Sequence, residues 1–422
     1  MLQMLIGRIS MRATAHVIAA VLLCFAGAAA HAAEPIKIGF GMAQTGPLAA
    51  NGKSALLAMQ IWAEDVNAKG GLLGRPVKLV YYDDQSNPST VPGLYTKLLD
   101  VDKVDLVVGG YATNMLAPAM PVIIQHNMVF LGLYGLAVNS EFHYPKYFSV
   151  ISSGPEPKLA FSEHFFQLAM QQNPKPQTVA IVAADAEFAK NAADGARENI
   201  KKAGLKVVYD RSYPPTTTDF TPIVRAIQAT NPDIVFVASY PLDSIGMVTA
   251  AHEIGLKTKL FGGGMVGLQS TAIKTKLGPM LNGIVNYDFW LPAKTMMYPG
   301  AEVFLKKYQA RAAAAGVDPL GYYMGPAGYA YLQVLGEAVE GAKTLDQDQI
   351  AKYMHEHSFK TVFGDLKFGA DGEWTESRVI EIQFQNISGN GLDQFSDMSK
   401  QVIVAPTNLE SGKLIYPYSP AK

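Results

Sequence analysis

Short apolar runs that alternate with helical stretches restrict the possible folds of this chain more than any other feature. In the first part of the chain the pattern predicts strands and helices in turn, with strands at 36–42, 77–82, 104–108 and 128–131 and helices at about 51–69, 89–101 and 115–125. Strands that are apolar along their whole length are buried on both faces, and alternation with helices indicates a parallel sheet. We therefore predict a doubly wound α/β lobe here.

The same alternation restarts near Thr178. It predicts strands at 179–183, 206–209, 234–238 and 259–261 and helices at about 189–203, 220–229, 244–254, 301–315, 325–341 and 349–357. The tail at 359–384 alternates like a hairpin around 369–372. Two extended, aromatic segments, 146–155 and 283–292, fit neither series and suit chain crossings between lobes.

The predicted fold is α/β, with two Rossmann-like lobes joined by a three-segment hinge and a ligand cleft between them. The N-terminal lobe is expected to comprise residues 33–150 and 286–345, and the C-terminal lobe residues 151–285 and 346–422. A chain of 422 residues is also longer than one hydrophobic core usually serves, which favours two domains.

Composition excludes several classes of function. The chain has 35 basic and 36 acidic side chains and a formal net charge of −1, so it lacks the basic excess that a nucleic-acid binder needs. Its single cysteine, Cys24, permits neither an intrachain disulfide nor a cysteine-based metal site.

Residues 1–32 have the features of a signal peptide. Arg8 and Arg12 precede an apolar run, and Ala30-His31-Ala32 fits the small-x-small pattern of a cleavage site. Synthesis could start at Met1 or Met11. The apolar run is too short to span a bilayer, and no later segment has eighteen consecutive apolar residues. We expect export to the periplasm, cleavage near Ala32 and no stable membrane insertion of the mature chain.

Leu23 precedes Cys24, where lipid attachment would require a small residue, so Cys24 is assigned to the discarded segment.

Motifs that resemble catalytic signatures fail on their details. Gly46-Pro-Leu-Ala-Ala-Asn-Gly-Lys-Ser54 has one residue too many for a phosphate-binding loop and a proline where a backbone N–H is needed. The spacing of His355-Glu356-His357 does not suit a metal site on a helix. No Gly-x-Ser-x-Gly elbow occurs. We therefore predict no enzyme activity, no cofactor and no metal.

The informative loops follow the carboxyl ends of the strands, where open α/β sheets bind ligands. Thr113 can cap a helix and leave backbone N–H groups free for a small carboxylate. Tyr134 follows the fourth strand between glycines, and Phe188 and Tyr240 occupy comparable places in the second lobe. Aromatic side chains at these positions favour an apolar pocket.

The stretch Ile36–Met42 with Thr45-Gly-Pro47, then Asp65–Gly74, Asp83-Asp84 and Asn87-Pro88, resembles leucine/isoleucine/valine-binding proteins. These are the type I periplasmic solute-binding proteins of branched-chain amino acid ABC transporters. The resemblance covers essentially the whole mature chain and is strongest before residue 120. It implies two lobes that close on a small-molecule carboxylate ligand and then dock to a membrane permease.

The resemblance also implies site residues. Thr113 and the region Tyr134–Leu136 match the family's carboxylate-holding positions, while Phe188 and Tyr240 match its second-lobe aromatics. The full set of candidate ligand-binding residues is Asn51, Tyr111, Ala112, Thr113, Tyr134, Gly135, Leu136, Phe188, Tyr240, Gly264 and Met265.

One loop departs from the family pattern. Members that bind α-amino acids typically carry an acidic residue after the strand that ends at Phe261, and this sequence has Gly262-Gly-Gly-Met-Val266. Since a buried, unpaired ammonium group costs several kcal/mol, either Asp243 or Asp185 reaches into the site or the ligand has no amino group. The latter alternative points to an aromatic or keto acid.

Two other classes of function stay open beside a transport protein. One is a ligand-sensing regulator of the same architecture, which the signal peptide and the absence of a following membrane helix disfavour. The other is an exported α/β enzyme, which the missing nucleophile–base pair disfavours.

Overall fold

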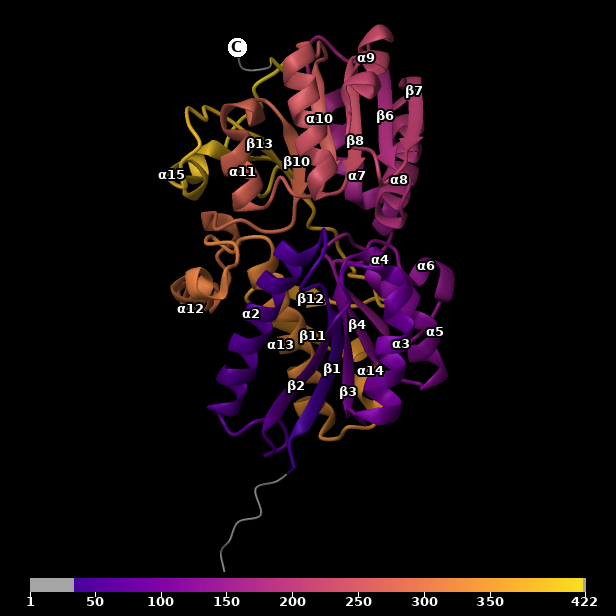
Figure 1. Ribbon diagram of the computed structural model, residues 1–422, viewed down its shortest axis with the longest axis vertical. Coiled ribbons are helices and arrows are strands. Elements are labelled where there is room, and N and C mark those ends of the chain that lie inside the picture. The colour runs from indigo at the N-terminus through magenta and orange to yellow at the C-terminus, as the bar shows by residue number, and fades with distance from the viewer. Residues whose placement is uncertain (1–33, 420–422) are drawn as a thin grey trace, which may run out of the picture.

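The computed structural model describes residues 34–419, which form two α/β lobes stacked along the long axis of the molecule (Figure 1). The predicted signal peptide, Cys24 and both possible start methionines lie outside the described residues. Among the described residues, no helix is both long and apolar enough to cross a bilayer.

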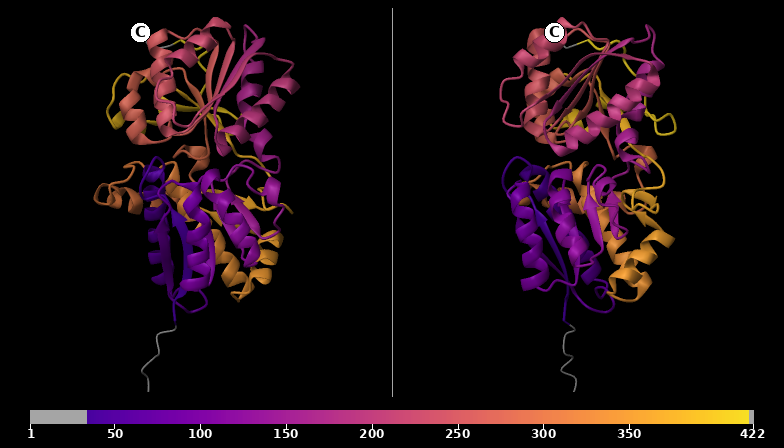
Figure 2. Two further views of the ribbon diagram at one scale, coloured as in Figure 1. Left: turned by 45° about the vertical axis from the view of Figure 1, so that its right-hand side comes forward. Right: turned by 90° about the vertical axis from the view of Figure 1, so that its right-hand side faces the viewer.

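A five-stranded parallel sheet in the order β2-β1-β3-β4-β5 forms the centre of the N-terminal lobe. Helices cover both faces of this sheet, so the apolar runs of β1, β3, β4 and β5 are buried, whereas edge strand β2 is partly exposed (Figures 1 and 2). The strands are β1 (Ile36–Met42), β2 (Val77–Asp83), β3 (Leu106–Tyr111), β4 (Phe130–Leu133) and β5 (Tyr147–Val150). The helices of the first part are α2 (Ala49–Asn67), α3 (Val91–Thr96), α4 (Thr113–Leu116), α5 (Met120–Gln125) and α6 (Asn139–Phe142).

A seven-stranded mixed sheet in the order β14-β13-β10-β9-β8-β6-β7 forms the centre of the C-terminal lobe. Five strands run parallel. At one edge, β13 pairs antiparallel with β10, and β14 pairs antiparallel with β13. The strands are β6 (Thr178–Ala184), β7 (Lys206–Tyr213), β8 (Ile234–Ser239), β9 (Leu260–Met265), β10 (Val285–Asp288), β13 (Ile380–Phe384) and β14 (Gln401–Ala405). The helices are α7 (Pro157–Met170), α8 (Glu187–Ala203), α9 (Thr221–Ala229), α10 (Pro241–Ile254), α11 (Thr271–Leu277) and α15 (Asp393–Ser396).

The chain passes between the lobes at 151–156, 289–300 and 375–379. The first and third crossings run side by side, because the Arg378 N–H donates to the Ser152 carbonyl at 2.7 Å. The segments expected to be crossings, 146–155 and 283–292, each contain an edge or inner strand, β5 and β10, and the chain crosses only after that strand ends. Their aromatic residues therefore lie partly in a sheet and partly in the crossing that follows it.

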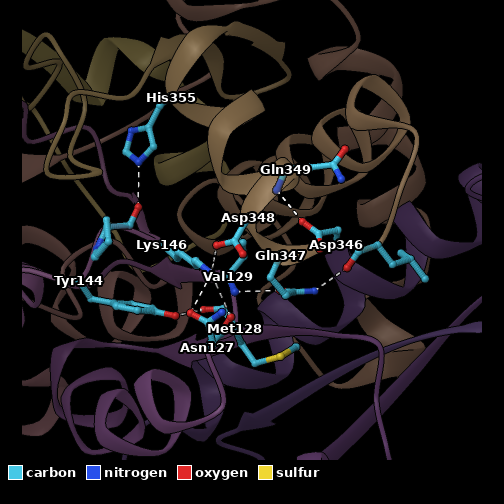
Figure 3. Close-up of polar contacts among 12 residues, drawn as sticks. Asn127, Met128, Val129, Tyr144, Lys146, Asp346, Gln347, Asp348, Gln349 and His355 are labelled. Carbon is cyan, nitrogen blue, oxygen red and sulfur yellow. Dashed lines mark hydrogen bonds and ion pairs between the residues drawn. The ribbon is translucent and has the colours of Figure 1, made fainter.

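The expected lobe boundary at residue 345 is wrong, because the N-terminal lobe continues beyond it. This lobe also contains α12 (Ala301–Ala315), α13 (Met324–Ala342), α14 (Gln347–Glu356) and the hairpin of β11 (Ser358–Thr361) and β12 (Gly364–Lys367). Gln347 Oε1 accepts a hydrogen bond from the Val129 N–H at 2.9 Å, and His355 Nε2 lies 2.8 Å from the Pro145 carbonyl (Figure 3). The Trp374 indole N–H donates to the Ser149 carbonyl at 2.9 Å, so the chain returns to the C-terminal lobe only after Trp374.

The tail turns twice. The β11–β12 hairpin turns at Val362-Phe363, and the turn expected at 369–372 is also present, between Phe368 and Trp374, which form an antiparallel bridge. Gly372 in this second turn packs on β5, where its carbonyl accepts from the Ser149 N–H at 2.9 Å. A Cβ at position 372 would lie 1.8 Å from the Tyr147 carbonyl oxygen, so glycine is required for this close approach.

A buried carboxyl beside the hinge gives a prediction for pH-dependent stability. Burial raises the pKa of Glu373 from 4.5 to about 8; the Ser149 hydroxyl lowers it and Asp371 raises it further. Because the folded state binds the proton more tightly than the unfolded state, stability falls as the pH rises from about 4.5 to about 8. We expect Glu373→Gln to be neutral at pH 4 and to stabilise the unliganded protein at pH 8 by about 1–3 kcal/mol.

Thermal unfolding at the two pH values tests this expectation. The melting temperature of Glu373→Gln should exceed that of the wild type by at least about 2 °C at pH 8. Glu376→Gln, at an exposed position three residues away, is the matched control and should melt like the wild type at both pH values. Equal stabilisation by Glu373→Gln at pH 4 and pH 8 would contradict a titration effect.

Candidate functional site

A cavity lies between the lobes, where the carboxyl ends of the strands of both sheets meet. Its volume is about 20 Å³, so side chains nearly fill the space between the lobes in this conformation. Both lobes and the crossings contribute side chains, most of them aromatic or aliphatic. The lining residues are Leu48, Tyr111, Ala112, Thr113, Tyr134, Ile151, Phe188, Tyr240, Val266, Tyr287, Phe289 and Tyr323.

The loop after β3 places a buried hydroxyl in the wall of this cavity. Thr113 is fully buried, and its Oγ1 accepts a hydrogen bond from the Leu136 N–H at 3.0 Å. The hydroxyl proton stays available to a ligand acceptor, because a threonine hydroxyl both donates and accepts. This bond joins the loop after β3 to the loop after β4. Both loops are predicted from the sequence to contact a ligand.

Strained backbone accompanies this hydroxyl. Ala112 has φ = 83° and Tyr134 has φ = 55°, both in regions that non-glycine residues rarely adopt. Such conformations cost of the order of 1–3 kcal/mol each and cluster at ligand sites. Both strained residues line the cavity.

Tyrosine hydroxyls supply most of the other polar groups. Asn51 Nδ2 donates to the Tyr111 hydroxyl at 2.9 Å, and the hydroxyls of Tyr287 and Tyr323 lie 3.1 Å apart. The Tyr134 hydroxyl donates to the Tyr323 carbonyl at 3.0 Å. Burial raises the pKa of Tyr111 to about 12, so the phenols stay neutral and act only as hydrogen-bonding groups at ordinary pH.

The C-terminal lobe closes the cavity with two aromatic rings. Phe188 and Tyr240 pack edge to face with ring centroids 6.0 Å apart. Asn114 Oδ1, from the opposite lobe, accepts hydrogen bonds from the Tyr240 hydroxyl at 2.8 Å and from the Phe188 N–H at 3.3 Å. Asn191 Nδ2 adds a third bond between lobes, to the Leu136 carbonyl at 3.0 Å. The structure is therefore a closed form of the two-lobed molecule.

Within residues 34–419, no residue that lines the cavity carries a carboxylate, an ammonium, a guanidinium or an imidazole group. Neither acid considered from the sequence reaches it. Asp185 pairs with Lys190 at 2.7 Å near the surface. Asp243 Oδ2 accepts from the Tyr213 hydroxyl at 3.1 Å, on the outer side of Tyr240.

Asp288 is the buried acid nearest the cavity in sequence, since both neighbours line it. Successive side chains on a strand point to opposite faces, and the Tyr287 ring contacts Phe161 of α7 with centroids 4.6 Å apart. This alternation predicts the Asp288 carboxyl on the other face, and Asp288 does not line the cavity. Its Oδ1 accepts from the Phe289 N–H at 2.8 Å, and its charge acts on Lys274 of α11 and on the Tyr134 hydroxyl. Burial raises the pKa of Asp288 to about 7.

The structure brings together six of the eleven residues named from the sequence. Tyr111, Ala112, Thr113, Tyr134, Phe188 and Tyr240 line the cavity. Asn51 and Leu136 stand behind it, bonded to Tyr111 and Thr113. Gly135 packs against Leu116 and Tyr147 instead.

Gly264 and Met265 belong to β9 and do not line the cavity. The Asn286 side chain accepts a hydrogen bond from the Met265 N–H and donates one to the Met265 carbonyl, each at 2.9 Å. From this loop, Val266 lines the cavity. Strand β9 is longer than the sequence pattern indicated, because glycine at 262–264 hid the continuation of the strand.

Sequence reasoning missed half of the lining. Tyr287 and Phe289 line the cavity and lie in the segment 283–292, for which the sequence predicts a crossing between lobes and no ligand contact. Tyr323 follows Gly321-Tyr322 at the start of α13 and carried no local signal. The remaining missed residues are Leu48, Ile151 and Val266.

The motifs rejected from the sequence have structural roles. Asp83 Oδ1 accepts from the Gln44 and Thr45 N–H groups at 2.8 and 3.2 Å, so the loop before α2 is held by a carboxylate rather than open to a phosphate. The His357 ring stacks on Tyr353 at 3.8 Å, while His355 faces β5. Within the described part of the chain, no group of three or more His, Cys, Asp or Glu residues is placed to hold a metal.

Comparison with known proteins identifies relatives of this chain. A family model described as periplasmic binding protein matches residues 35–380. The chain is 24% identical over 372 residues to an amino acid binding protein of Pseudomonas aeruginosa, covering 85% of this chain and 93% of that protein. It is 25% identical over 391 residues to Leu/Ile/Val-binding protein homolog 7 of Brucella abortus, covering 88% of this chain and 94% of that protein.

Solved structures share the fold with different ligands. A branched-chain amino acid transporter substrate binding protein of Streptococcus pneumoniae in complex with isoleucine superposes with a TM-score of 0.70 at 18% identity, covering 91% of this chain and 100% of that chain. A solute binding protein of an ABC transporter of Rhodopseudomonas palustris in complex with 3,4-dihydroxybenzoic acid gives 0.70 at 17% identity, covering 84% and 94%. The same two-lobed fold therefore accommodates amino acids and aromatic acids.

Proposed function

This chain belongs to the periplasmic binding protein family, and on that premise we propose that it captures a small carboxylate that lacks an amino group. The body of the ligand is apolar or aromatic, as in an aromatic acid or a branched keto acid. The two lobes close around it in the periplasm and deliver it to the membrane permease of an ABC transporter. The role is binding without turnover.

The chemistry of the cavity carries this proposal. The Thr113 hydroxyl is a donor for a carboxylate, and the surrounding walls are the rings of Tyr134, Phe188 and Phe289. A ring or branched chain buried against these walls gains about 25 cal/mol for each Å² removed from water. The same walls provide no negative charge for a cation.

The absence of an acid from the cavity lining favours one ligand class. An α-amino acid needs an anionic partner for its ammonium group, and an uncompensated buried charge costs about 3–5 kcal/mol. The run 262–266 occupies the loop where the resemblance implied an acid, and its Met265 is buried within β9. Asp288 lies on the opposite face of its strand from Tyr287, and it is half protonated near pH 7. The α-keto acid or benzoate class avoids the cost altogether.

Closure is coupled to capture by the contacts between lobes. The three hydrogen bonds from Asn114 and Leu136 to the C-terminal lobe form only when the lobes meet. A ligand that contacts both lobes adds to these bonds and shifts the equilibrium towards the closed form. A permease that binds the closed form would then distinguish loaded from empty protein.

A matched pair of ligands tests the proposal. Leucine and 4-methyl-2-oxopentanoate have the same branched chain and carboxylate and differ only in the amino or keto group. Isothermal titration of the purified mature protein should give at least ten times tighter binding for the better of 4-methyl-2-oxopentanoate and benzoate than for leucine. Titration with 4-hydroxybenzoate extends the aromatic arm.

One variant is the control for this test. Asp288→Asn should leave the affinity for the preferred acid within about threefold, because Asp288 does not line the cavity. Leucine binding tighter than every acid in the panel, and lost in Asp288→Asn, would overturn the proposal and identify Asp288 as an ammonium partner.

A further inference from the structure

A second hollow lies directly outside the ligand cavity, at the mouth of the cleft. Its volume is about 200 Å³, and it takes apolar side chains from both lobes, among them Pro47, Met115, Pro215 and Leu242. Leu48 and Tyr240 line both this outer groove and the inner cavity. These two side chains, one from each lobe, therefore form the wall between the two spaces.

In each of four loops, one residue lines the inner cavity and a residue next to it or two positions away lines the outer groove. Along the first two loops, Thr113 lines the inner cavity and Asn114 the outer groove, and Leu48 is followed outward by Pro47. In the other lobe, Phe188 is inner and Ala186 outer, and Tyr240 is followed outward by Pro241. The outer groove thus continues the inner cavity, and only the wall separates them.

The two halves of the wall are held differently. The Tyr240 hydroxyl donates to Asn114 Oδ1 at 2.8 Å, so this ring is part of the contact that closes the lobes. The Leu48 side chain is aliphatic, so it takes part in the wall by packing and forms no hydrogen bond between the lobes. Its backbone N–H is bonded to Ser86 Oγ at 3.0 Å, and its carbonyl accepts from the Asn51 and Gly52 N–H groups at the start of α2. Truncating Leu48 therefore changes the wall and leaves the backbone contacts intact.

We propose that the Leu48 side chain limits the length of the ligand, and that its removal joins the inner cavity to the outer groove. This inference rests on the proposed function. The wild-type protein then selects compact carboxylates, because any extension must displace Leu48 or Tyr240. An alkyl or aryl extension that passes the wall would meet Pro47, Met115 and Leu242 and be buried against apolar surface.

Benzoates with alkyl groups of one to four carbons at ring position 3 or 4 measure this limit. For the wild type, affinity should fall at least tenfold between methyl- and butyl-substituted benzoate. In Leu48→Ala the order should reverse, with each added methylene that enters the outer groove strengthening binding by up to about fourfold. Benzoate itself should weaken by less than about tenfold in Leu48→Ala, because it loses only one apolar contact.

Leu242→Ala is the matched control, since Leu242 is 65% exposed and lines only the outer groove. It should leave the whole wild-type series unchanged, and in the double variant with Leu48→Ala it should reduce the gain for the butyl compound. The inference is overturned if Leu48→Ala binds benzoate but shows the same length limit as the wild type. Failure of the wild-type protein to bind any acid would instead contradict the proposed function, so the two failures are distinguishable.

Discussion

Thr113→Val is expected to weaken binding of the preferred carboxylate by about 100-fold, because the variant loses a charge-assisted hydrogen bond worth about 1.5–3 kcal/mol. Thr113 is the one aliphatic hydroxyl among the residues that line the described cavity, and it is fully buried. A buried hydroxyl strengthens its bond to an anion because little water competes there. Isothermal titration with 4-methyl-2-oxopentanoate and benzoate measures the loss.

Thr113→Ser provides the control for this variant. Valine removes the acceptor that Thr113 Oγ1 offers to the Leu136 N–H, whereas serine keeps both the acceptor and the donor. We expect Thr113→Ser to bind within about fivefold of the wild type. Thermal unfolding of both variants without ligand separates loss of the carboxylate contact from loosening of the loop. Binding by Thr113→Val within about threefold of the wild type would remove Thr113 from the carboxylate site.

Gly262→Ala is expected to destabilise the protein by more than about 4 kcal/mol or to prevent folding, because two mechanisms of strain combine at this position. Gly262 has φ = 140°, in a region of backbone conformation that residues with a side chain rarely adopt. An added Cβ would lie 1.7 Å from the Val285 carbonyl oxygen. The partner is the backbone of β10, which pairs with β9 at the centre of the C-terminal sheet and cannot move aside.

Urea denaturation followed by circular dichroism measures this effect. Gly389→Ala is the matched control, because no heavy atom lies within 4 Å of its added Cβ and φ is unexceptional there. Its unfolding free energy should stay within about 0.5 kcal/mol of the wild type. Equal urea midpoints for Gly262→Ala and the wild type would show that β9 and β10 can separate without cost.

This glycine also bears on the ligand. The run Gly262–Gly264 departs from the acidic loop that the family resemblance implied, and the structure gives it a packing role: Gly263 has φ = 102°, and an added Cβ there would lie 2.3 Å from the Phe236 ring. The run without an acid is thus part of a longer, tightly paired β9. An acidic side chain at position 265 would lie in the buried interior of the sheet.

Local patterns predicted the elements well because their causes are local. The buried strands β1 and β8 are continuous apolar runs, and the glycines that end α8 and α10, Gly204 and Gly255, adopt the left-handed conformation. Lobe membership was harder. Helix α14 joins the N-terminal lobe through contacts such as Gln347 with Val129, which are 218 positions apart in the chain.

The sequence by itself determined the α/β class, the two series of strands and the loops that carry Thr113, Tyr134, Phe188 and Tyr240, because hydrophobic period and turn residues act over a few positions. Only the tertiary structure decided that Tyr287, Phe289 and Tyr323 complete the cavity, that Leu48 and Tyr240 line both the cavity and the outer groove, and that no acidic residue lines the described cavity. These facts depend on how segments hundreds of residues apart pack together, and no local pattern records the contacts between them.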